Sequence, residues 1–397
     1  MRHFLIASVI ALIVCSSLSS QQQVDNRLTA ASTRFSLKLY DQLLKQRSDN
    51  TFVSPASVML ALAMTYNGAD GTTRDGMARA LEIEGMSLED VNQSFSNLRS
   101  ALASTDPKVQ LKIANSLWAR NGFTLDPAFV ERNKKHYAAE IANLDFSDPS
   151  APKIINAWVS KNTEGKIDKI IEQIKDGDIL FLINAIYFKG QWEHEFKKEN
   201  TKPDVFRLTG GAQKQVQMMS QSGSYLYYKG KDFQSVALRY GKGGVSMYIF
   251  LPDELRSLNQ FERDLTTENW NAWMQSYRML PGEVKLPRFK VEWESSLIHA
   301  LSALGMEESF DSKRANFSQM AKLNTDARIY ISEVKHKALC EVNEEGTVAA
   351  AATAVGAALT SLPPPPFSMK VDRPFFFAIR DNQTGLILFM GSVANPG

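Results

Sequence analysis

The side chains that most often carry catalysis or bind metals are sparse in this chain, and they do not fall into a catalytic spacing. The sequence has five His and two Cys in 397 residues. His194 and Glu195 are adjacent, but no second His follows at the spacing of a zinc-protease helix. GxSxG, CxxC, P-loop and GxGxxG patterns are also missing. The sequence therefore predicts no enzyme active site, no metal site and no cofactor.

The segment Glu344–Ser361 (EEGTVAAAATAVGAALTS) is the most unusual part of the chain. After its two acids it contains only uncharged, mostly small residues, too few of them bulky to anchor a core and too few polar to form a typical disordered tail. Asp326–Glu345 reads as a strand, and Phe367–Arg380 and Leu386–Val393 are apolar and β-prone. We expect an exposed loop, tethered by sheet at both ends, that can itself become a strand.

The rest of the chain supplies helices first and strands later. Ser54 before Pro55 is a helix-start signal, and the apolar run that follows predicts a buried helix. Ile179–Phe188 is continuously apolar, as expected for a strand covered on both faces. Segregated helices and strands predict an α+β fold rather than a doubly wound sheet. The expected helices are Arg27–Arg47, Phe52–Tyr66, Ser87–Ala103, one starting at Asp126–Pro127 and Ala151–Thr163, and the further strands are Val109–Trp118, Gly244–Leu251 and Glu283–Val291.

The N-terminus has the pattern of a secretory signal peptide over residues 1–20. Arg2 and His3 precede an apolar run that is too short to span a bilayer, and small residues follow that run. A lipoprotein anchor at Cys15 is disfavoured, because Val14 is too large for the position before such a cysteine. We therefore expect a secreted, extracellular protein in which residues 26–397 form one domain around a single large core.

The composition of the chain argues against several classes of binding partner and against a disulfide. Lys+Arg 45 against Asp+Glu 43 leaves almost no net charge, which disfavours nucleic acid as the main partner. No later segment has the pattern of a transmembrane helix. Removal of residues 1–20 leaves Cys340 as the one cysteine, so an intramolecular disulfide cannot form and the core must supply the stability. Cys340 shares a strand face with Ala338 and Val342, which predicts a buried small hydrophobe rather than a reactive thiol.

Five segments in order give the chain a resemblance to the serpin family, over a span from about Asn26 to the C-terminus. They are Asn50–Ser57 (NTFVSPAS), Leu182–Trp192 (LINAIYFKGQW), Val334–Leu339 (VKHKAL), Glu344–Thr353 and Arg373–Val393 (RPFFFAIRDNQTGLILFMGSV). Two further stretches, DPKVQLKIANSLWAR and KIINAWVSKNTEGKID, are more similar to compact microbial serpins than to vertebrate ones.

The resemblance implies one domain of about nine helices and three β-sheets, with an exposed reactive-centre loop at about residues 346–366. It also implies a suicide mechanism, in which a serine proteinase attacks the loop and forms an acyl-enzyme. The cut loop then inserts as a new strand into the main sheet and distorts the proteinase before deacylation. The chain would act as a monomeric proteinase inhibitor and not as an enzyme.

Family spacing from Gly346 places the reactive bond at Thr360–Ser361, with Leu359–Thr360 as the alternative. No Lys or Arg occurs between Gly346 and Met369, so trypsin-like targets are disfavoured, and Thr360 or Leu359 suits elastase-like or chymotrypsin-like pockets. Small inward residues would let the loop insert quickly. The hinge consists of Glu344, Glu345, Gly346, Thr347, Ala349, Ala350, Ala351 and Ala352, and the inward side chains would be Thr347, Ala349, Ala351, Thr353, Val355 and Ala357.

Other residues match the machinery by which the family opens its sheet. Ser54, Ser57, Asn184 and His336 match a buried polar cluster where the strands part, here called the shutter, which is satisfied when closed and rearranged when open. Trp192, Arg288 and Glu344 match the place where insertion begins, here called the breach, and an ion pair between Arg288 and Glu344 is expected.

Several alternatives stay open from the sequence. A non-inhibitory serpin that acts as a carrier or chaperone is the rival function. Sequons at Asn92, Asn316 and Asn382 would carry glycans only in a eukaryotic secretory host. Arg99 is the single basic residue in Ser87–Ala103, which disfavours activation by a glycosaminoglycan through that helix. The run Pro363–Pro366 would stiffen the end of the loop.

Overall fold

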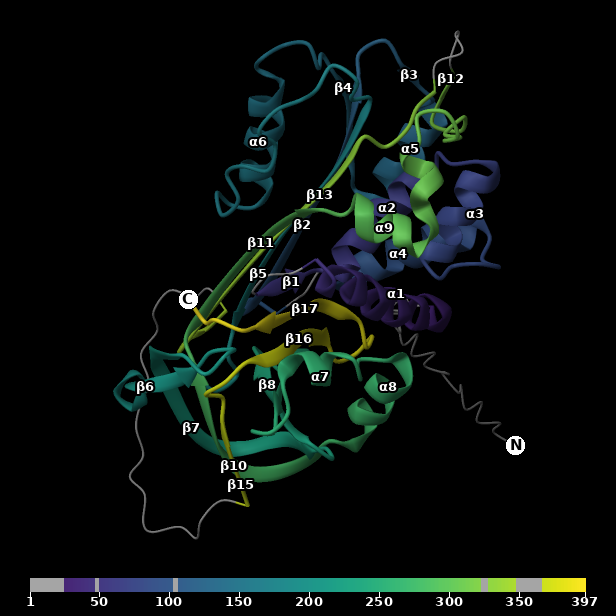
Figure 1. Cartoon of the computed structure of the whole chain (residues 1–397). Coiled ribbons are helices and arrows are strands. Elements are labelled where there is room, and N and C mark those ends of the chain that lie inside the picture. Colours follow the sequence, from purple (N-terminus) through teal and green to yellow (C-terminus); the bar gives the residue numbers. More distant parts are fainter. Residues whose placement is uncertain (1–24, 47–49, 103–105, 323–327, 348–365) are drawn as a thin grey trace, which may run out of the picture.

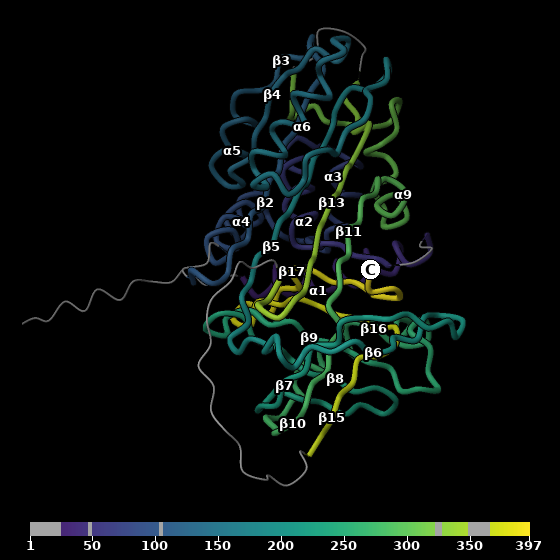
Figure 2. Tube along the Cα trace, turned by 90° about the vertical axis from the view of Figure 1, so that its left-hand side faces the viewer, coloured from purple at the N-terminus to yellow at the C-terminus, as the bar shows by residue number. Residues whose placement is uncertain are grey.

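A computed structural model describes residues 25–46, 50–102, 106–322, 328–347 and 366–397 (Figure 1, Figure 2). Within these ranges the chain forms nine α-helices and three β-sheets of nine, six and two strands, so the fold is α+β as expected. The expected signal peptide, the reactive bond at Leu359, Thr360 or Ser361, and Ala349–Ala352 lie outside the described residues.

The helices lie mainly in the first part of the chain, as the periodicity predicts. Ser54 caps α2, because its side chain accepts a hydrogen bond from the backbone N–H of Ser57. All twelve residues of α2 are buried. In chain order the helices are α1 (Asn26–Leu44), α2 (Pro55–Tyr66), α3 (Gly71–Ala80), α4 (Leu88–Leu102), α5 (Pro127–Tyr137), α6 (Ala151–Asn162), α7 (Leu258–Glu262), α8 (Thr267–Ser276) and α9 (Ile298–Leu301).

The six-stranded sheet runs through the upper half of the molecule, with α6 on one face and the bundle around α2 on the other (Figure 1). Its strands in spatial order are β11 (Phe289–Ser296), β13 (Glu333–Asn343), β14 (Gly346–Thr347), β5 (Leu180–Gln191), β2 (Val109–Arg120) and β4 (Glu140–Leu144). Beyond the two residues of β14, strands β13 and β5 pair directly and in parallel, from Glu333 with Phe181 to Leu339 with Tyr187. We call this parallel pairing the β5–β13 seam.

The nine-stranded sheet forms the lower half, with α7 and α8 against it (Figure 1). Its order is β1 (Thr51–Val53), β17 (Ile387–Val393), β16 (Phe375–Asp381), β9 (Val245–Pro252), β8 (Phe233–Tyr240), β7 (Gln213–Lys229), β10 (Arg278–Pro287) and β15 (Phe367–Lys370), and β6 (Lys202–Arg207) also pairs with β7. The two-stranded sheet joins β3 (Thr124–Leu125) to β12 (Ala321–Lys322).

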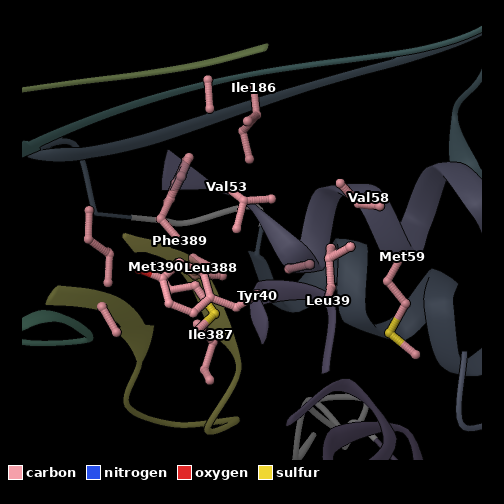
Figure 3. Packing of buried hydrophobic residues seen from close by; sticks show 14 of the residues in the cluster. Leu39, Tyr40, Val53, Val58, Met59, Ile186, Ile387, Leu388, Phe389 and Met390 are labelled. Atoms are coloured by element: carbon pink, nitrogen blue, oxygen red, sulfur yellow. The ribbon is translucent and has the colours of Figure 1, made fainter. Parts of the chain in front are cut away.

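The largest core lies where the two large sheets and the first helices meet (Figure 3). Phe52 on β1 stacks on Phe389 of β17, with ring centroids 5.4 Å apart. Ile186 of β5 and Val58 of α2 belong to the same buried cluster and approach it from the six-stranded sheet and the helical side. The seam therefore lies directly on the main core, and parting it disturbs the packing below.

Two expected strands have different bounds in the structure. Glu283–Val291 was expected to be one strand, but the chain changes sheets at Arg288, because Pro287 pairs with Met218 in one sheet and Phe289 pairs with Val342 in the other. The strand expected over Asp326–Glu345 is β13, which begins only at Glu333 and ends at Asn343.

Candidate functional site: the entry between β5 and β13

The loop enters the six-stranded sheet at Gly346 and Thr347. These two residues pair antiparallel with Asn343 and Val342 of β13 on one side and with Gln191 and Gly190 of β5 on the other. Gly346 has φ +146°, and a Cβ there would lie 2.0 Å from the carbonyl oxygen of Gly190. Only glycine therefore fits this first position.

Thr347 is the first residue of the loop whose side chain enters the interior. Its side chain is fully buried, and its hydroxyl lies 2.7 Å from the hydroxyl of Tyr240. Tyr240 stacks on Trp192 with ring centroids 4.4 Å apart. Burial raises the pKa of Tyr240 far above its usual range, so the phenol stays neutral and forms an ordinary hydrogen bond with the Thr347 hydroxyl. Thr347 is thus packed against neutral aromatic side chains.

Glu344 and Arg288 form the ion pair that the resemblance led us to expect. The Arg288 guanidinium contacts both carboxylate oxygens, with its shortest contact, Nη2 to Oε1, at 2.6 Å. The Thr201 hydroxyl donates to the same carboxylate at 2.6 Å. Burial alone would raise the pKa of Glu344, but the Arg288 and Thr201 contacts outweigh it and lower that pKa. Glu344 is therefore ionised and fixed.

Trp192 holds the turn between β13 and β14 through two hydrogen bonds. Its indole Nε1–H donates to the carbonyl of Asn343 at 3.0 Å, and its backbone N–H donates to the carbonyl of Glu345 at 2.9 Å. Lys198 pairs with the Glu345 carboxylate at 2.9 Å. Trp192, Arg288 and Glu344 thus surround one turn, and this turn delivers the loop into the sheet.

The four shutter residues meet in one buried cluster at the middle of the β5–β13 seam. The Nδ1 atom of His336 lies 2.5 Å from Oδ1 of Asn184, and Nε2 accepts the backbone N–H of Ser54 at 3.2 Å. Nε2 is thus the acceptor and Nδ1 carries the proton. The Asn184 amide donates to the Ser57 hydroxyl at 2.5 Å. Burial lowers the pKa of His336 to about 3, which keeps the ring neutral.

Sequence reasoning missed three residues of these clusters. Asn115 on β2 accepts from the Asn184 amide at 2.5 Å and joins the shutter. Its place among the apolar residues of an alternating strand was a signal that could have found it. Thr201 contacts Glu344 and Tyr240 contacts Thr347 at the breach, and no local sequence pattern predicts these long-range contacts.

The far end of the loop returns to the nine-stranded sheet as β15, whose one partner among the described strands is β10. The Phe367 ring stacks on Tyr227 with centroids 4.0 Å apart and meets Tyr225 edge-on. A Cβ at Gly282 would lie 2.1 Å from the same ring, so the glycine makes room for it. Aromatic packing therefore fixes the first residue of β15.

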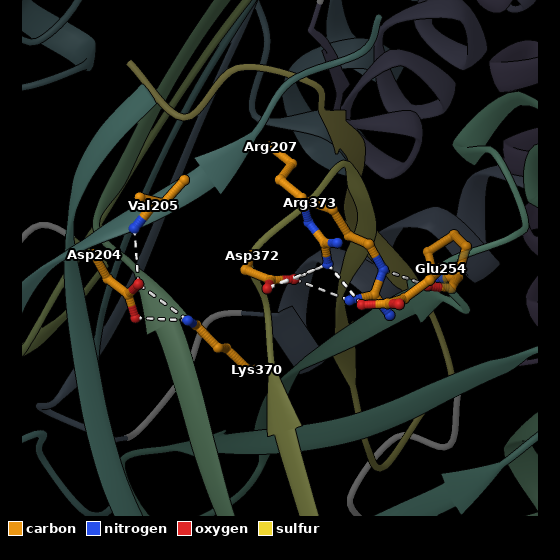
Figure 4. Close-up of polar contacts among 8 residues, drawn as sticks. Asp204, Val205, Arg207, Glu254, Lys370, Asp372 and Arg373 are labelled. Carbon is orange, nitrogen blue, oxygen red and sulfur yellow. Dashed lines mark hydrogen bonds and ion pairs between the residues drawn. The ribbon is translucent and has the colours of Figure 1, made fainter. Parts of the chain in front are cut away.

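Ion pairs fix the other end of β15 (Figure 4). Lys370 contacts Asp204 of β6 at 2.8 Å and lowers the pKa of that carboxyl. Asp372 accepts from Arg207 at 3.2 Å and from Arg373 at 2.9 Å. Arg373 also donates to the carbonyl of Pro252. We call Phe367, Lys370, Asp372 and Arg373 the β15 anchor.

The structure contradicts one of the three sequons. Asn92 is 3% exposed, and its amide exchanges hydrogen bonds with Asn67 and accepts one from the Tyr137 hydroxyl, so no glycan can be attached there in the folded protein. Asn382 is half-buried and donates to Gly243 and Ser246. Asn316 is half-buried, and its Oδ1 accepts from the backbone N–H of Ser318.

No group of three or more His, Cys, Asp or Glu side chains in the described part of the chain is arranged to hold a metal ion. None of the helices there is both long and apolar enough to cross a bilayer.

Comparisons with known proteins agree with this geometry. The family model described as "Serpin (serine protease inhibitor)" matches residues 30–396. The leukocyte elastase inhibitors of Homo sapiens and Sus scrofa are 36% and 37% identical over 383 residues, which is 93% of this chain and 100% of theirs. The thermophilic serpin Tengpin in its native state superposes with a TM-score of 0.89 at 34% identity, covering 95% of this chain and 96% of that one. The chain therefore belongs to the serpin family of serine protease inhibitors.

Proposed function

We propose that the chain is a secreted suicide inhibitor of elastase-like or chymotrypsin-like serine proteinases. The proteinase serine attacks the carbonyl of Thr360, with Leu359 as the alternative, and forms an ester. The amine of the following residue leaves with the C-terminal fragment. The freed N-terminal part of the loop then enters the β5–β13 seam and carries the bound proteinase with it before water can hydrolyse the ester.

The observation that carries this proposal is the position of Gly346 and Thr347. They already occupy the space between β13 and β5, hydrogen-bonded on both sides, at the open end of the seam. Insertion therefore continues a strand that has begun. The Thr347 side chain is already buried, so the following residues have an interior side and an exterior side assigned to them.

Energetics favour completion of this strand. Insertion replaces seven parallel residue pairs, Glu333–Leu339 with Phe181–Tyr187, by antiparallel ladders on both sides of the new strand. The 14 residues from Thr347 to Thr360 span roughly 46 Å at about 3.3 Å per residue. At about 1 kcal/mol net for each added hydrogen bond the gain is on the order of 10 kcal/mol, offset in part by ordering the loop.

The loop sequence and the relatives support the choice of target. No positive charge lies between Gly346 and Met369, so a trypsin-like pocket has no side chain to bind. Ala357, Ala358 and Thr360 suit the small pocket of an elastase, and Leu359 suits that of chymotrypsin. Relatives that match this chain over 93% of its length carry the name leukocyte elastase inhibitor.

The deciding experiment mixes the chain with pancreatic elastase and with chymotrypsin, and resolves the products on a denaturing gel. We expect a covalent complex that survives boiling, and N-terminal sequencing of the released fragment should begin at Ser361 or at Thr360. If every serine and cysteine proteinase tested only clips the loop and leaves no complex, the proposal fails. Trypsin is the matched negative control, because the loop offers it no Lys or Arg.

Thermal unfolding separates this proposal from the rival carrier or chaperone function. An inhibitor whose loop inserts gains stability when the loop is cut, whereas a protein whose loop stays outside melts at the same temperature before and after.

Export is tested separately, by sequencing the N-terminus of protein recovered from the medium of a secreting host. We expect cleavage after residue 19 or 20, and an intact Met1 on the recovered protein would contradict export by this route.

A further inference from the structure

The side chain that Thr347 meets in the interior comes from the other large sheet. Tyr240 is the last residue of β8, and a β-bridge joins it to Trp192, the residue that follows β5. A Cβ at Gly190 would lie 2.8 Å from the Tyr240 ring, so the glycine leaves room for that ring beside β5. Trp192 stacks on the ring, and the Thr347 hydroxyl meets its phenol. Whatever holds the end of β8 therefore also holds the place where Thr347 is buried.

One carboxylate joins this end of β8 to the six-stranded sheet. Asp106 precedes β2, and its Oδ1 accepts the backbone N–H of Lys108 at 2.9 Å. Its Oδ2 accepts the backbone N–H of Lys242, two residues after Tyr240, at 2.7 Å. Gly241 has φ +52°, and a Cβ there would lie 2.1 Å from the same carboxylate, so glycine lets the turn come this close. Asp106 thus bridges the start of β2 and the turn that follows β8.

The backbone of the same turn is bonded to the end of β5. The N–H of Gly241 donates to the carbonyl of Gln191 at 2.8 Å, and the N–H of Glu193 donates to the carbonyl of Arg239 at 2.8 Å. The turn therefore contacts β5 and the start of β2, which are neighbouring strands of the six-stranded sheet. Hydrogen bonds from backbone N–H groups to a carboxylate are stronger than those to a neutral acceptor, so removal of the Asp106 carboxylate should loosen the turn.

We propose that Asp106 is a positioning residue for inhibition, because its carboxylate ties the turn after β8 to the start of β2. This tie keeps Tyr240 where the Thr347 side chain is buried. Loss of the carboxylate leaves two backbone N–H groups without these acceptors, so the turn loosens and Tyr240 can move away from Trp192. Thr347 is then seated less firmly between the strands. The assignment rests on the proposed function, since firm seating matters for inhibition only if the loop goes on to insert.

Two substitutions and one matched control test the assignment in the full chain. Asp106→Ala removes both acceptor oxygens, and Asp106→Asn keeps one. The control is Asp126→Ala, because Asp126 also accepts two backbone N–H groups, from Ala128 and Phe129, but at the start of α5. Each of these variants is also made in a Trp192→Phe background, which identifies the fluorescence that comes from Trp192.

The first measurement is the tryptophan emission of the intact protein. Trp192 is 1% exposed and stacked on Tyr240, so movement of Tyr240 admits water to the indole. We expect emission at longer wavelength from Asp106→Ala, a smaller shift from Asp106→Asn and no shift from Asp126→Ala. The shift should vanish in the Trp192→Phe background. Unchanged emission from Asp106→Ala, or a shift that persists without Trp192, would overturn the assignment and leave the proposed function untouched.

The second measurement is the ratio of loop cleavage to covalent complex with pancreatic elastase and with chymotrypsin. We expect Asp106→Ala to raise this ratio roughly two- to ten-fold, the change in a rate that corresponds to one net hydrogen bond. Asp106→Asn should raise it less, and Asp126→Ala should leave it unchanged. In a Tyr240→Phe background the effect of Asp106→Ala should shrink, because it acts through the contact that the phenol makes, whereas independent effects would multiply.

Three results of the second measurement would contradict the assignment. A wild-type ratio in Asp106→Ala, despite shifted emission, would show that the tie positions Tyr240 without serving inhibition. An undiminished effect in the Tyr240→Phe background would show that Asp106 acts by another route. If the wild type itself forms no complex with any proteinase tested, the proposed function fails and the role in inhibition fails with it, whereas the emission result still reports whether Asp106 holds Tyr240.

Discussion

The two ends of the loop are held by the protein in different ways. At the N-terminal end, Gly346 and Thr347 lie inside a sheet and pair with strands on both sides. At the C-terminal end, β15 lies at the edge of the other large sheet and, within the part of the chain that the structure describes, pairs with β10 alone. The first end is held by a backbone ladder and buried aromatic contacts, and the second by the β15 anchor of one stacked ring and a set of ion pairs (Figure 4).

Under the proposed mechanism, this difference identifies the N-terminal end as the one that moves. The N-terminal end leads into the seam, where more hydrogen bonds become available as the strand grows. The C-terminal end is a finished strand whose contacts gain nothing from a cut upstream. We therefore expect substitutions at the entry to change the fate of the proteinase, and substitutions in the β15 anchor to change stability without changing that fate.

Thr347→Arg should have the largest effect. The guanidinium would have to enter the uncharged pocket against Tyr240 and Trp192, where a buried unpaired charge is strongly disfavoured. We expect the covalent complex to disappear from the gel and the loop to be cut as an ordinary substrate. Thr347→Ser is the matched control and should keep the complex. If the Thr347→Arg variant still inhibits fully, burial of the Thr347 side chain between β13 and β5 is not required for inhibition.

Phe367→Ala tests the opposite end. The ring is 7% exposed and stacked on Tyr227, and removing a buried Phe ring lowers the free energy of unfolding by about 3 kcal/mol. Denaturant unfolding of the intact protein measures this loss. The complex should still form at the wild-type stoichiometry. A loss of complex equal to that of Thr347→Arg would show that the two ends are not distinct.

Of the three substitutions, Arg288→Met should change the free energy of unfolding least, and the size of that change should depend on pH. Glu344 is 3% exposed at its side chain but Arg288 is 46% exposed, so solvent screens the pair and its loss should cost about 1–2 kcal/mol near neutral pH. Arg288 helps to lower the pKa of Glu344 in the folded protein, so the stabilisation is fully present above the ordinary value of 4.5 and is lost as the pH falls from there through the lowered pKa.

Unfolding curves of wild type and Arg288→Met at a series of pH values check this sign. The difference in the free energy of unfolding should be full at pH 7 and should shrink below about pH 4.5. A difference that grows on acidification would mean that Arg288 stabilises the turn by something other than the Glu344 carboxylate. Lys198→Met, which removes the ion pair to the neighbouring Glu345, is the control for a general loss of positive charge.

Much of the fold and of the candidate site could be predicted from the sequence, because these parts depend on local sequence patterns. The apolar run after Ser54 and the continuous run at Ile179–Phe188 predict α2 and β5, and both are buried in the structure. The shutter and breach residues came from family motifs, and the structure brings each set together. The sheet change at Arg288 escaped prediction, because a strand pattern of the right period continues through a residue whose neighbours pair with different sheets.

Other contacts could not be read from sequence, since they join positions far apart in the chain. Thr201 meets Glu344 across 143 positions, and Asn115 meets Asn184 across 69. Asn92 shows the converse error, because its sequon is local while its burial against Asn67 and Tyr137 is not. Local sequence patterns identify the strands, whereas tertiary packing decides which polar side chains are paired with one another and which are accessible.

The rate at which the Cys340 thiol is chemically labelled reports on the opening of the six-stranded sheet. It is the one cysteine among the described residues, it is 1% exposed, and it lies on β13 two residues from Val342, the partner of Thr347. Burial raises the pKa of its thiol, so the closed protein offers no thiolate to an alkylating reagent. The rate at which a thiol reagent labels the resting protein therefore measures how often the strands separate without any proteinase, and that labelling should stop once an inserted loop covers the sulfur.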